Sequence, residues 1–384
     1  MRRILTFLTA IALLLVSLGV GVFTADLPFW RRAFQLPLPP GEAYLPVVTI
    51  GTESPPAQGS NPVPAIDALV VEEAASRAGA AGSRALLVMY RDALVVERYF
   101  QTDDASTLLP AGLVARPLAA MAIGVAIAER RITGIDDPVA RYLPEWDDEP
   151  RGRITLRQLL EETSGLETGG DIRGLPYRSP WLDPQTLPAF ATSRGVRMLL
   201  GNDFESSALG FQLEHEPGGF YNLSPANTQL AAVIVERATG EPYETFVDRK
   251  LWQPVGAGIA ELQLDRRAGM PAAHCCWRAT ARDMLRVLSL FVTDGAHAGR
   301  AVLPPGWAQE MARASRVSAG TGMQVTRLDI DGAETLLVTD DNGSASWIVP
   351  QRRLAILNIT NPGGSAVADL PALLMKGIEA PAEQ

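Results

Sequence analysis

Histidine and cysteine, which often bind metals or act in catalysis, are few in this sequence, and the three histidines lie far apart. His215, His274 and His297 are the only histidines, and no H-E-x-x-H or C-x-x-C spacing accompanies them, so we expect no metal site and no cofactor. Cys275 and Cys276 are neighbours, which makes disulfide geometry difficult, and no disulfide framework is expected. We interpret His274 as part of a packed loop, because adjacent residues seldom form a thiol–imidazole pair.

Lysine, the usual source of a side-chain amine, is also scarce. Lys250 and Lys376 are the only two lysines. Hydrolysis through a hydroxyl nucleophile needs a base that can take up the hydroxyl proton, and an arginine cannot do so because its guanidinium stays protonated. Neither lysine lies near Arg116 in the sequence. A hydroxyl–lysine pair is therefore not expected in that part of the chain.

The elements that would position these side chains follow from the spacing of apolar residues. Residues 118–127 are apolar on every face, which indicates a helix buried on all sides, and Pro117 suits its first turn. Further helices are expected at 65–79, 186–200, 225–239, 278–294, 305–313 and 369–378, and strands within 84–100, 326–341 and 345–360. This order indicates an α+β fold whose first and last segments share one sheet.

The N-terminal segment is typical of a membrane anchor. Residues 4–25 carry no charge, follow Arg2 and Arg3, and are long enough to span a bilayer. We expect a single-pass protein of the cell membrane with its domain on the extracytoplasmic, periplasmic side; a cleaved signal peptide, and so a secreted protein, is the alternative. The prolines between Pro37 and Pro64 favour an extended spacer after this segment. The predicted division is 1–25 anchor or signal, 26–64 Pro-rich linker, 65–376 globular domain and 377–384 tail.

Charge and composition exclude one class of partner. The net charge is −9 and the pI about 5.1, with no basic block beyond short arginine pairs, so a nucleic-acid partner is not expected. Apolar residues make up 47% of the chain, which is ample for a large core. The partners that remain are the membrane, through the N-terminal segment, and a small molecule or a protein of the cell envelope.

Several stretches together carry a resemblance to a known family. They lie at 127–146, 154–166, 213–247, 251–257, 275–295 and 303–311. In this order they resemble the serine-hydrolase superfamily of class C β-lactamases, penicillin-binding proteins, esterases and aminohexanoate-oligomer hydrolases. The resemblance implies a class C β-lactamase-like α+β fold. In it, the N- and C-terminal segments form an antiparallel sheet flanked by helices, and an all-helical lobe packs beside it.

The family acts through three motifs, and the resemblance places each of them on unusual residues. Its Ser-x-x-Lys, in which the lysine takes the serine proton, falls on Leu113 to Arg116. The tyrosine of its Tyr-x-Asn motif falls on Leu223, and the asparagine on Pro225. Its Lys/His-x-Gly motif, which supplies hydrogen-bond donors on a strand, falls on Asp341 to Gly343.

These replacements predict a scaffold that has lost its chemistry, and the protein is interpreted as a pseudoenzyme whose remaining cleft binds a ligand or partner. The cleft is predicted to contain Arg116, Tyr221, Leu223, Asp341 and Gly343. We further expect a salt bridge between Arg116 and an acid of the third motif, Asp340 or Asp341, because an unpaired buried guanidinium is costly. Extension of the Arg116 side chain to the surface is the alternative.

Two other functions stay open. The first is an active esterase, amidase or β-lactam-acting hydrolase with displaced catalytic residues, for which Tyr221 and Ser224 are weak stand-ins and Ser106, Thr107 and Ser344 are further candidates. The second is a structural or interaction module whose cleft is closed by side chains. An open concavity at Leu113, Arg116, Leu223 and Asp341 would favour ligand binding, and a closed one would favour the structural module.

Overall fold

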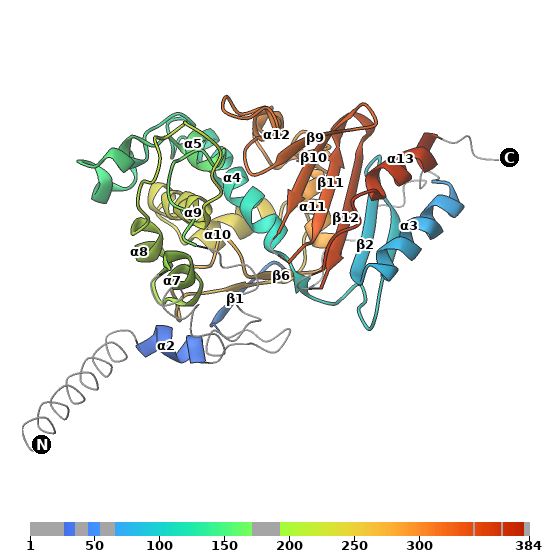
Figure 1. Cartoon of the computed structure of the whole chain (residues 1–384), viewed down its shortest axis with the longest axis horizontal. Coiled ribbons are helices and arrows are strands. Elements are labelled where there is room, and N and C mark those ends of the chain that lie inside the picture. The colour runs from blue at the N-terminus through green and yellow to red at the C-terminus, as the bar shows by residue number, and fades with distance from the viewer. Residues whose placement is uncertain are drawn as a thin grey trace, which may run out of the picture.

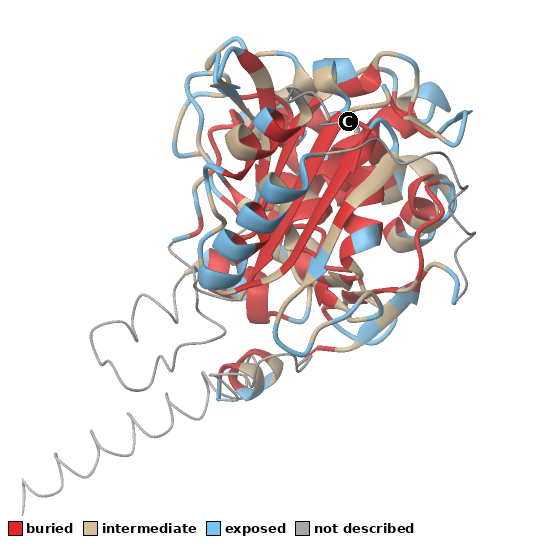
Figure 2. Ribbon diagram, turned by 90° about the vertical axis from the view of Figure 1, so that its right-hand side faces the viewer, coloured by how far each residue is buried: buried red, intermediate tan, exposed pale blue. Residues whose placement is uncertain are grey.

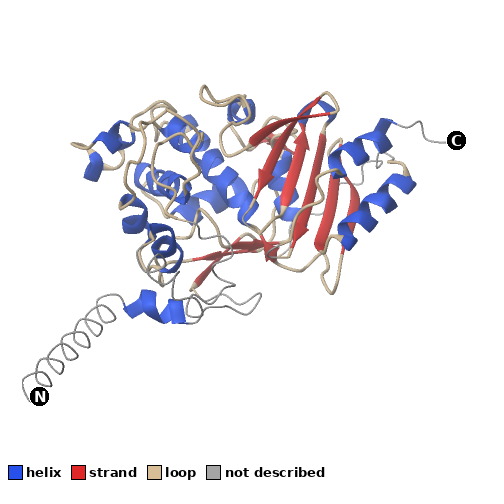
Figure 3. Ribbon diagram, in the orientation of Figure 1, coloured by secondary structure: helices blue, strands red, loops and turns tan. Residues whose placement is uncertain are grey.

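The computed structural model describes residues 27–34, 45–53, 66–170, 193–340, 342–361 and 364–379. Most of them form two parts that share one long buried helix (Figure 1). A six-stranded sheet with helices on both faces makes one part, and a group of helices makes the other (Figure 3). The α+β architecture expected from the sequence is confirmed.

The large sheet joins the two ends of the domain. Its strand order is β3-β2-β12-β11-β10-β9, and all five strand pairs are antiparallel. The strands are β2 (Ser83–Tyr90), β3 (Ala93–Tyr99), β9 (Thr326–Ile330), β10 (Ala333–Thr339), β11 (Ala345–Val349) and β12 (Leu354–Thr360). Pairing of β12 with β2 brings the C-terminal strands beside the N-terminal hairpin, as the sequence predicts.

Apolar side chains point to both faces of the central strands, and this explains why both faces of the sheet are covered. Side chains at successive positions of a strand point to opposite faces. Leu86 and Val88 of β2 belong to the apolar cluster formed with α3 (Ala68–Ala80) and α13 (Leu370–Glu379), whereas Leu87 belongs to the main core. The central strands are accordingly buried, and the exposed faces of the two helices lie outermost (Figure 2).

The buried helix α4 (Gly112–Ala128) connects the sheet to the helical part. Every residue from Leu113 to Ala126 is buried except Arg116. Gly124 is required for close packing, because a Cβ there would lie 2.3 Å from the indole of Trp307. Trp307 opens α12 (Trp307–Ala312) and donates a hydrogen bond to the Ala120 carbonyl. The helix is thus held in place on all sides, as its apolar sequence predicts.

The helical part supplies one wall of the cleft beside α4. Its α-helices are α5 (Leu156–Leu160), α7 (Arg194–Leu200), α8 (Phe204–Leu209), α9 (Pro225–Thr239) and α10 (Tyr243–Val247), and a π-helical turn follows at Asp248–Trp252. Short 3-10 turns lie at Val139–Arg141, Pro144–Trp146 and Pro150–Arg153, and another, Pro350–Arg352, connects β11 to β12 of the large sheet. On the other side of α4, α11 (Ala281–Ser289) packs between the helix and the sheet. It is shorter than the helix predicted at 278–294. Residues 277–279 pair as a strand before it, and the helix ends at Ser289.

Parts of the predicted spacer at 26–64 are folded, which differs from an extended linker. Helix α2 (Leu27–Phe34) packs on α7, and β1 (Val47–Ile50) pairs with β5 (Ala260–Gln263). A small sheet of order β1-β5-β6-β4 results, completed by β6 (Trp277–Ala279) and β4 (Leu109–Pro110), and a short hairpin joins Ala296–His297 to Arg300–Ala301. Phe29 and Trp30 give α2 a buried face, which the proline content of this segment does not predict.

The two cysteines form a disulfide with each other. This bond is unexpected, because adjacent cysteines meet disulfide geometry with difficulty. Cys276 has a φ of +67°, so the backbone adopts an uncommon conformation at the pair. The bond closes no long loop and therefore does not cross-link distant segments. His274 forms no thiol–imidazole pair, which agrees with the sequence interpretation.

Among the residues that the structure describes, no helix is long and apolar enough to cross a membrane. The predicted anchor at 4–25 lies outside the described residues.

Candidate ligand-binding cleft

The start of α4 presents one polar side chain among buried apolar ones. Leu113 is fully buried, whereas the Arg116 side chain is 23% exposed. Because successive residues of a helix are about 100° apart, Arg116 lies nearly one turn beyond Leu113, on the side that opens toward the helical part. A charged guanidinium is therefore the group that α4 offers to the cleft.

Glu162 is the partner of this guanidinium and the centre of a hydrogen-bond network. Oε1 of Glu162 accepts from Nη2 of Arg116 at 3.1 Å and from Nε2 of Gln324 at 2.8 Å. Oε2 accepts from the backbone N–H of Ser224 at 3.0 Å and from Nδ2 of Asn227 at 2.6 Å. A carboxylate has about four acceptor positions, so all of them are occupied.

Local structure holds Glu162 in place. It follows α5, whose N-terminus is closed by a capping box between Thr155 and Gln158. Its φ of +57° lies in the left-handed region, which a non-glycine residue occupies at some cost. The carbonyl of Glu162 also accepts a hydrogen bond from the N–H of Asn222 at 2.7 Å. The network therefore ties α5 to the loop that precedes α9.

Arg116 has donors left over after these contacts. Its Nε donates to Oε1 of Gln324 at 3.0 Å, and one N–H of Nη2 is used by Glu162. A guanidinium has five N–H donors, and within the described residues the other three have no protein acceptor. The partly exposed guanidinium can therefore donate to a bound molecule while it stays paired with Glu162.

A small pocket opens beside this network. It is lined by Arg116, Glu162, Tyr221, Leu223, Gly322, Gln324, Val325, Thr326, Leu337, Val338 and Thr339. Its volume of about 80 Å³ is several times the roughly 10–15 Å³ that one water requires. One small polar group of a ligand fits here, and the rest of the ligand would lie outside.

Tyr221 contributes a phenol to the rim. Partial burial raises the pKa of Tyr221, the Glu162 carboxylate raises it further, and Arg116 opposes the rise. The phenol is therefore protonated at neutral pH and can donate a hydrogen bond, but it cannot take up a proton as a base. Leu223 is 40% exposed at the same rim and offers an apolar surface.

The predicted cleft residues are only partly brought together. Arg116, Tyr221 and Leu223 line the pocket, while Gly343 is absent from its lining and Asp341 lies outside the described residues. At Gly343 the φ is +86° and a Cβ would lie 2.1 Å from the Gly364 carbonyl, so a turn explains this glycine. The sheet wall comes instead from the end of β10.

The expected salt bridge of Arg116 with Asp340 is wrong, because Arg116 pairs with Glu162. Asp340 lies beside Gly112, where an added Cβ would be 3.6 Å from the Asp340 Cβ. Its Oδ1 accepts from the N–H groups of Asn342 at 2.9 Å and Ser344 at 3.0 Å. Asp340 therefore stabilises the turn that follows β10. It lies beside Gly112, about one turn of α4 before Arg116.

The candidate hydroxyls lie in structural positions. Ser224 is buried at the start of α9, and its hydroxyl donates to the Glu167 carbonyl at 2.7 Å. Ser106 and Thr107 both donate to Asp104 in a surface turn, and the Ser344 hydroxyl accepts from the N–H of Thr360. None of these three residues, nor Ser224, lines the pocket.

Side chains that could act as bases are also placed elsewhere. Lys250 pairs with Glu129, just beyond the C-terminal end of α4, and the helix is about 25 Å long by its 17 residues. Lys376 lies on α13, on the far face of the sheet. His274 is buried, with Nδ1 in contact with Oε1 of Gln229 at 2.9 Å. Burial, with a smaller effect of Arg116, lowers the pKa of His274 to about 4.

Sequence reasoning missed Glu162, Gln324 and the pocket residues of β10. Glu162 stands in "LLEETSGL", and in the sequence only the nearby leucines and Gly165 set it apart. Its partners lie 46 to 162 residues away along the chain, so no local pattern indicates them.

The fold agrees with comparisons to known proteins. Residues 66–373 match the family model described as Beta-lactamase. The chain therefore belongs to the β-lactamase family, whose relatives include hydrolases of several kinds.

Two relatives show the range of these similarities. The chain is 26% identical over 298 residues to the 6-aminohexanoate-dimer hydrolase of Paenarthrobacter ureafaciens, covering 76% of this chain and 73% of that protein. It is 33% identical over 159 residues to esterase EstB of Burkholderia gladioli, covering 39% and 37% respectively.

Solved structures show the same fold. A putative 6-aminohexanoate-dimer hydrolase from Bacillus anthracis aligns with a TM-score of 0.65 at 17% identity, over 87% of this chain and 89% of that one. A D-stereospecific amidohydrolase from Streptomyces sp. aligns with a TM-score of 0.60 at 18% identity, over 81% and 99%.

Proposed function

We propose that this protein is a membrane-anchored, extracytoplasmic member of the β-lactamase family that binds a ligand in its cleft without hydrolysing it. The observation that carries the proposal is the Arg116–Glu162 pair at the start of α4. There the family pattern calls for a serine and a proton-accepting lysine, and this chain has the buried Leu113 and a guanidinium held by a carboxylate.

The chemistry of the pocket supports binding over acyl transfer. Its hydroxyl groups belong to Tyr221, Thr326 and Thr339, and among the described residues none of them forms a hydrogen bond with a side chain that could remove its proton. Glu162 is the one carboxylate in the lining, and its acceptor positions are filled. A nucleophile that is not activated remains weak at neutral pH.

The open pocket favours a ligand over a purely structural role. Arg116 keeps unused N–H donors, and the protonated Tyr221 phenol adds another at the rim. The positive charge of Arg116 is already balanced by Glu162, so the site is nearly neutral. Donors in a neutral pocket suit an uncharged acceptor such as an amide or ester carbonyl.

Two features support a location outside the cytoplasm. The uncharged segment at 4–25 follows two arginines, as in an anchor whose N-terminus stays in the cytoplasm. The Cys275–Cys276 disulfide is also typical of an oxidising compartment, since cytoplasmic thiols are kept reduced.

Covalent labelling tests the absence of acyl transfer. The full chain is incubated with a fluorophosphonate and with a fluorescent penicillin, and an active relative such as a 6-aminohexanoate-dimer hydrolase serves as the positive control. We expect no stable adduct on the full chain by intact-mass spectrometry. A stoichiometric adduct on any residue that lines the pocket would overturn the proposal.

Ligand binding needs a separate measurement. Small amides, esters and carboxylic acids are screened for stabilisation of the full chain, and hits are repeated with Tyr221→Phe. Tyr142→Phe is the matched control, because Tyr142 donates to Asp137 and is not part of the pocket lining. Uncharged carbonyl compounds should stabilise the native chain and the control more than Tyr221→Phe. If no compound binds, the cleft has only a structural role.

An active hydrolase with displaced residues is the second candidate. It is favoured by Tyr221 in the pocket lining and by the hydrolase names of the relatives. A panel of ester and amide substrates tests it, with Tyr221→Phe and Ser224→Ala as variants. Turnover that either substitution abolishes would support this candidate and contradict the first.

A further inference from the structure

Helix α2 has two faces that suggest a second contact surface. Phe29, Trp30 and Ala33 are buried against α7. Leu27, Arg31 and Phe34 lie on the opposite stripe, at spacings of four and three residues, and all three are exposed. Leu27 is 53% and Phe34 is 55% exposed, which is unusual for large apolar side chains.

The buried face fixes α2 rigidly to the domain. The Arg32 guanidinium donates to the carbonyl groups of Leu200, Gly201 and Asp265, so it joins the end of α7 to the loop after β5. The Arg197 guanidinium lies 5.1 Å from the centre of the Phe29 ring. The helix therefore cannot swing away from the domain without breaking several contacts.

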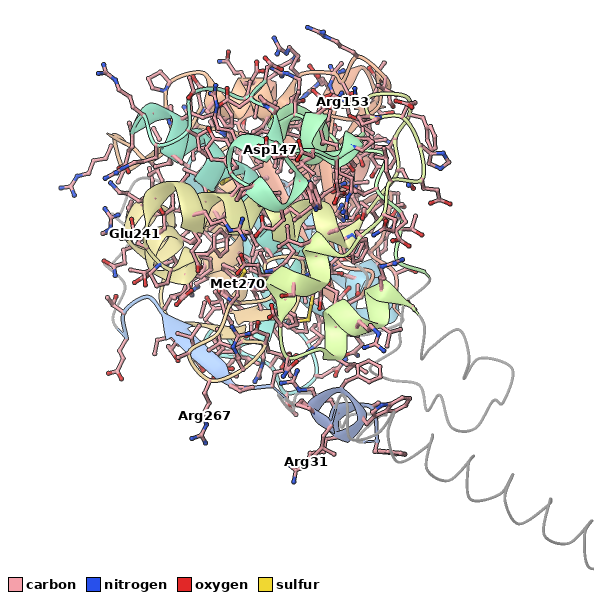
Figure 4. All side chains as sticks on the ribbon, turned by 90° about the vertical axis from the view of Figure 1, so that its left-hand side faces the viewer. Arg31, Asp147, Arg153, Glu241, Arg267 and Met270 are labelled. Atoms are coloured by element: carbon pink, nitrogen blue, oxygen red, sulfur yellow. A yellow bond between two sulfur atoms is a disulfide. The ribbon has the colours of Figure 1, made fainter. Side chains whose placement is uncertain are left out.

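Positive charge gathers beside the exposed stripe, on a chain that is strongly acidic overall. Arg266 and Arg267 follow Asp265, the residue that Arg32 contacts, and both are exposed. Figure 4 shows Arg31 and Arg267 on the same side of the molecule, with Arg153 on the opposite side. Within the part of the chain that the structure describes, neither Arg31 nor Arg267 has an acidic partner. Arg266 pairs with Asp265.

We propose that this surface, formed by Leu27, Arg31, Phe34, Arg266 and Arg267, lies on the anionic headgroups of the membrane that anchors the chain. The inference rests on the proposed anchoring. With residues 4–25 across the bilayer, a single residue separates the anchor from Leu27, so α2 begins within about 8 Å of the membrane boundary. Apolar side chains flanked by arginines are typical of a helix at the lipid–water interface.

This contact would give the domain a fixed orientation. The anchor is followed at once by a docked helix, so the domain is held by its α2 side and does not move freely on a long linker. Bound lipid would then cover α2, at the lower left of the molecule in Figure 1, together with the loop after β5 that Arg32 contacts. Helix α3, which carries the exposed Leu69, lies on the other side of the domain and would face away from the bilayer.

Fluorescence quenching in nanodiscs tests this orientation. The full chain is labelled at Ala268→Cys, beside Arg267, or at Leu69→Cys on α3; both positions are exposed and the native cysteines are bonded to each other. Discs contain phosphatidylglycerol and a lipid with a quenching headgroup. We expect at least about fivefold stronger quenching at position 268 than at position 69, because quenching requires contact with the headgroups.

Charge reversal provides the matched comparison. Arg31→Glu with Arg267→Glu should reduce quenching at position 268 about fivefold, whereas Arg153→Glu with Arg316→Glu, which changes the net charge equally, should leave it unchanged. Equal quenching at positions 268 and 69 in discs that contain the chain would overturn the contact surface and leave the anchor intact. A chain that does not enter the discs would overturn the anchor, and with it the surface.

Discussion

Two buried arginine–carboxylate pairs in this molecule have the same chemistry and different surroundings. Arg286 of α11 pairs with Asp283 at 2.7 Å and donates to the Gly256 carbonyl at 2.8 Å, with side chains only 8% and 3% exposed. In the Arg116–Glu162 pair the contact is 3.1 Å long, and the arginine is 23% exposed in a pocket. A closed pair can only support the fold, whereas an open pair can also meet a ligand.

Removing the carboxylate charge should have the largest effect on both pairs. Glu162→Gln leaves Arg116 without its counter-ion, and Asp283→Asn does the same to Arg286. We expect each substitution to lower the free energy of unfolding by about 3–5 kcal/mol, since a partly buried charge loses its partner. Urea unfolding of the detergent-solubilised chain measures this. A loss below about 1 kcal/mol for Glu162→Gln would show that the pair contributes little.

The neutral His274 beside this region should make stability depend on pH. Its pKa is lowered to about 4 in the folded chain, against about 6.5 when unfolded, so the unfolded state binds more protons between these values. Stability should therefore fall as the pH drops from about 6.5 to 4, by up to roughly 3 kcal/mol. His274→Gln should flatten the slope. The same slope in both proteins would assign the effect to other groups.

Replacement of each arginine should separate the open pair from the closed one. Arg116→Met leaves Glu162 with three hydrogen bonds, and water can reach it through the pocket. We therefore expect the free energy of unfolding to fall by about 1–2 kcal/mol. Arg286→Met leaves Asp283 buried without access to water, so we expect the free energy of unfolding to fall by about 3 kcal/mol. Parallel urea titrations measure the difference. Equal losses would mean that the pocket does not hydrate Glu162.

The smallest effect on stability is expected at the rim. Tyr221→Phe removes a hydroxyl that forms no hydrogen bond within the described residues, so the free energy of unfolding should change by less than about 0.5 kcal/mol. Binding of a carbonyl ligand should weaken about tenfold, because one hydrogen bond is lost. Calorimetric titration of a ligand found by screening measures this. Unchanged affinity would place the ligand away from Tyr221.

Periodicity and family resemblance predict the fold well because the relevant signals are local. The apolar run around Leu118 indicates a buried helix, and the strand pattern at 345–360 indicates a sheet core. The folded part of 26–64 was missed because α2 is short and depends on tertiary contacts of Phe29 and Trp30. The Cys275–Cys276 bond was missed because it contradicts the usual geometric preference.

The cleft was only half predictable for a related reason. Arg116, Tyr221 and Leu223 could be placed there because they lie in stretches with matching spacing. Glu162 could not, since its hydrogen bonds connect segments that are distant in the chain. A motif comparison assigns residues to the positions of a family pattern, but it does not show which contacts those residues make.

Glu162 also limits what substitutions at the start of α4 could do for hydrolysis. A lysine introduced at position 116 would inherit the carboxylate as its counter-ion, which would keep the new amine protonated and unfit as a base. A serine at position 113 alone would gain no activating neighbour. A serine–lysine pair at positions 113 and 116 would therefore also need a change at position 162, which frees the new amine from the carboxylate.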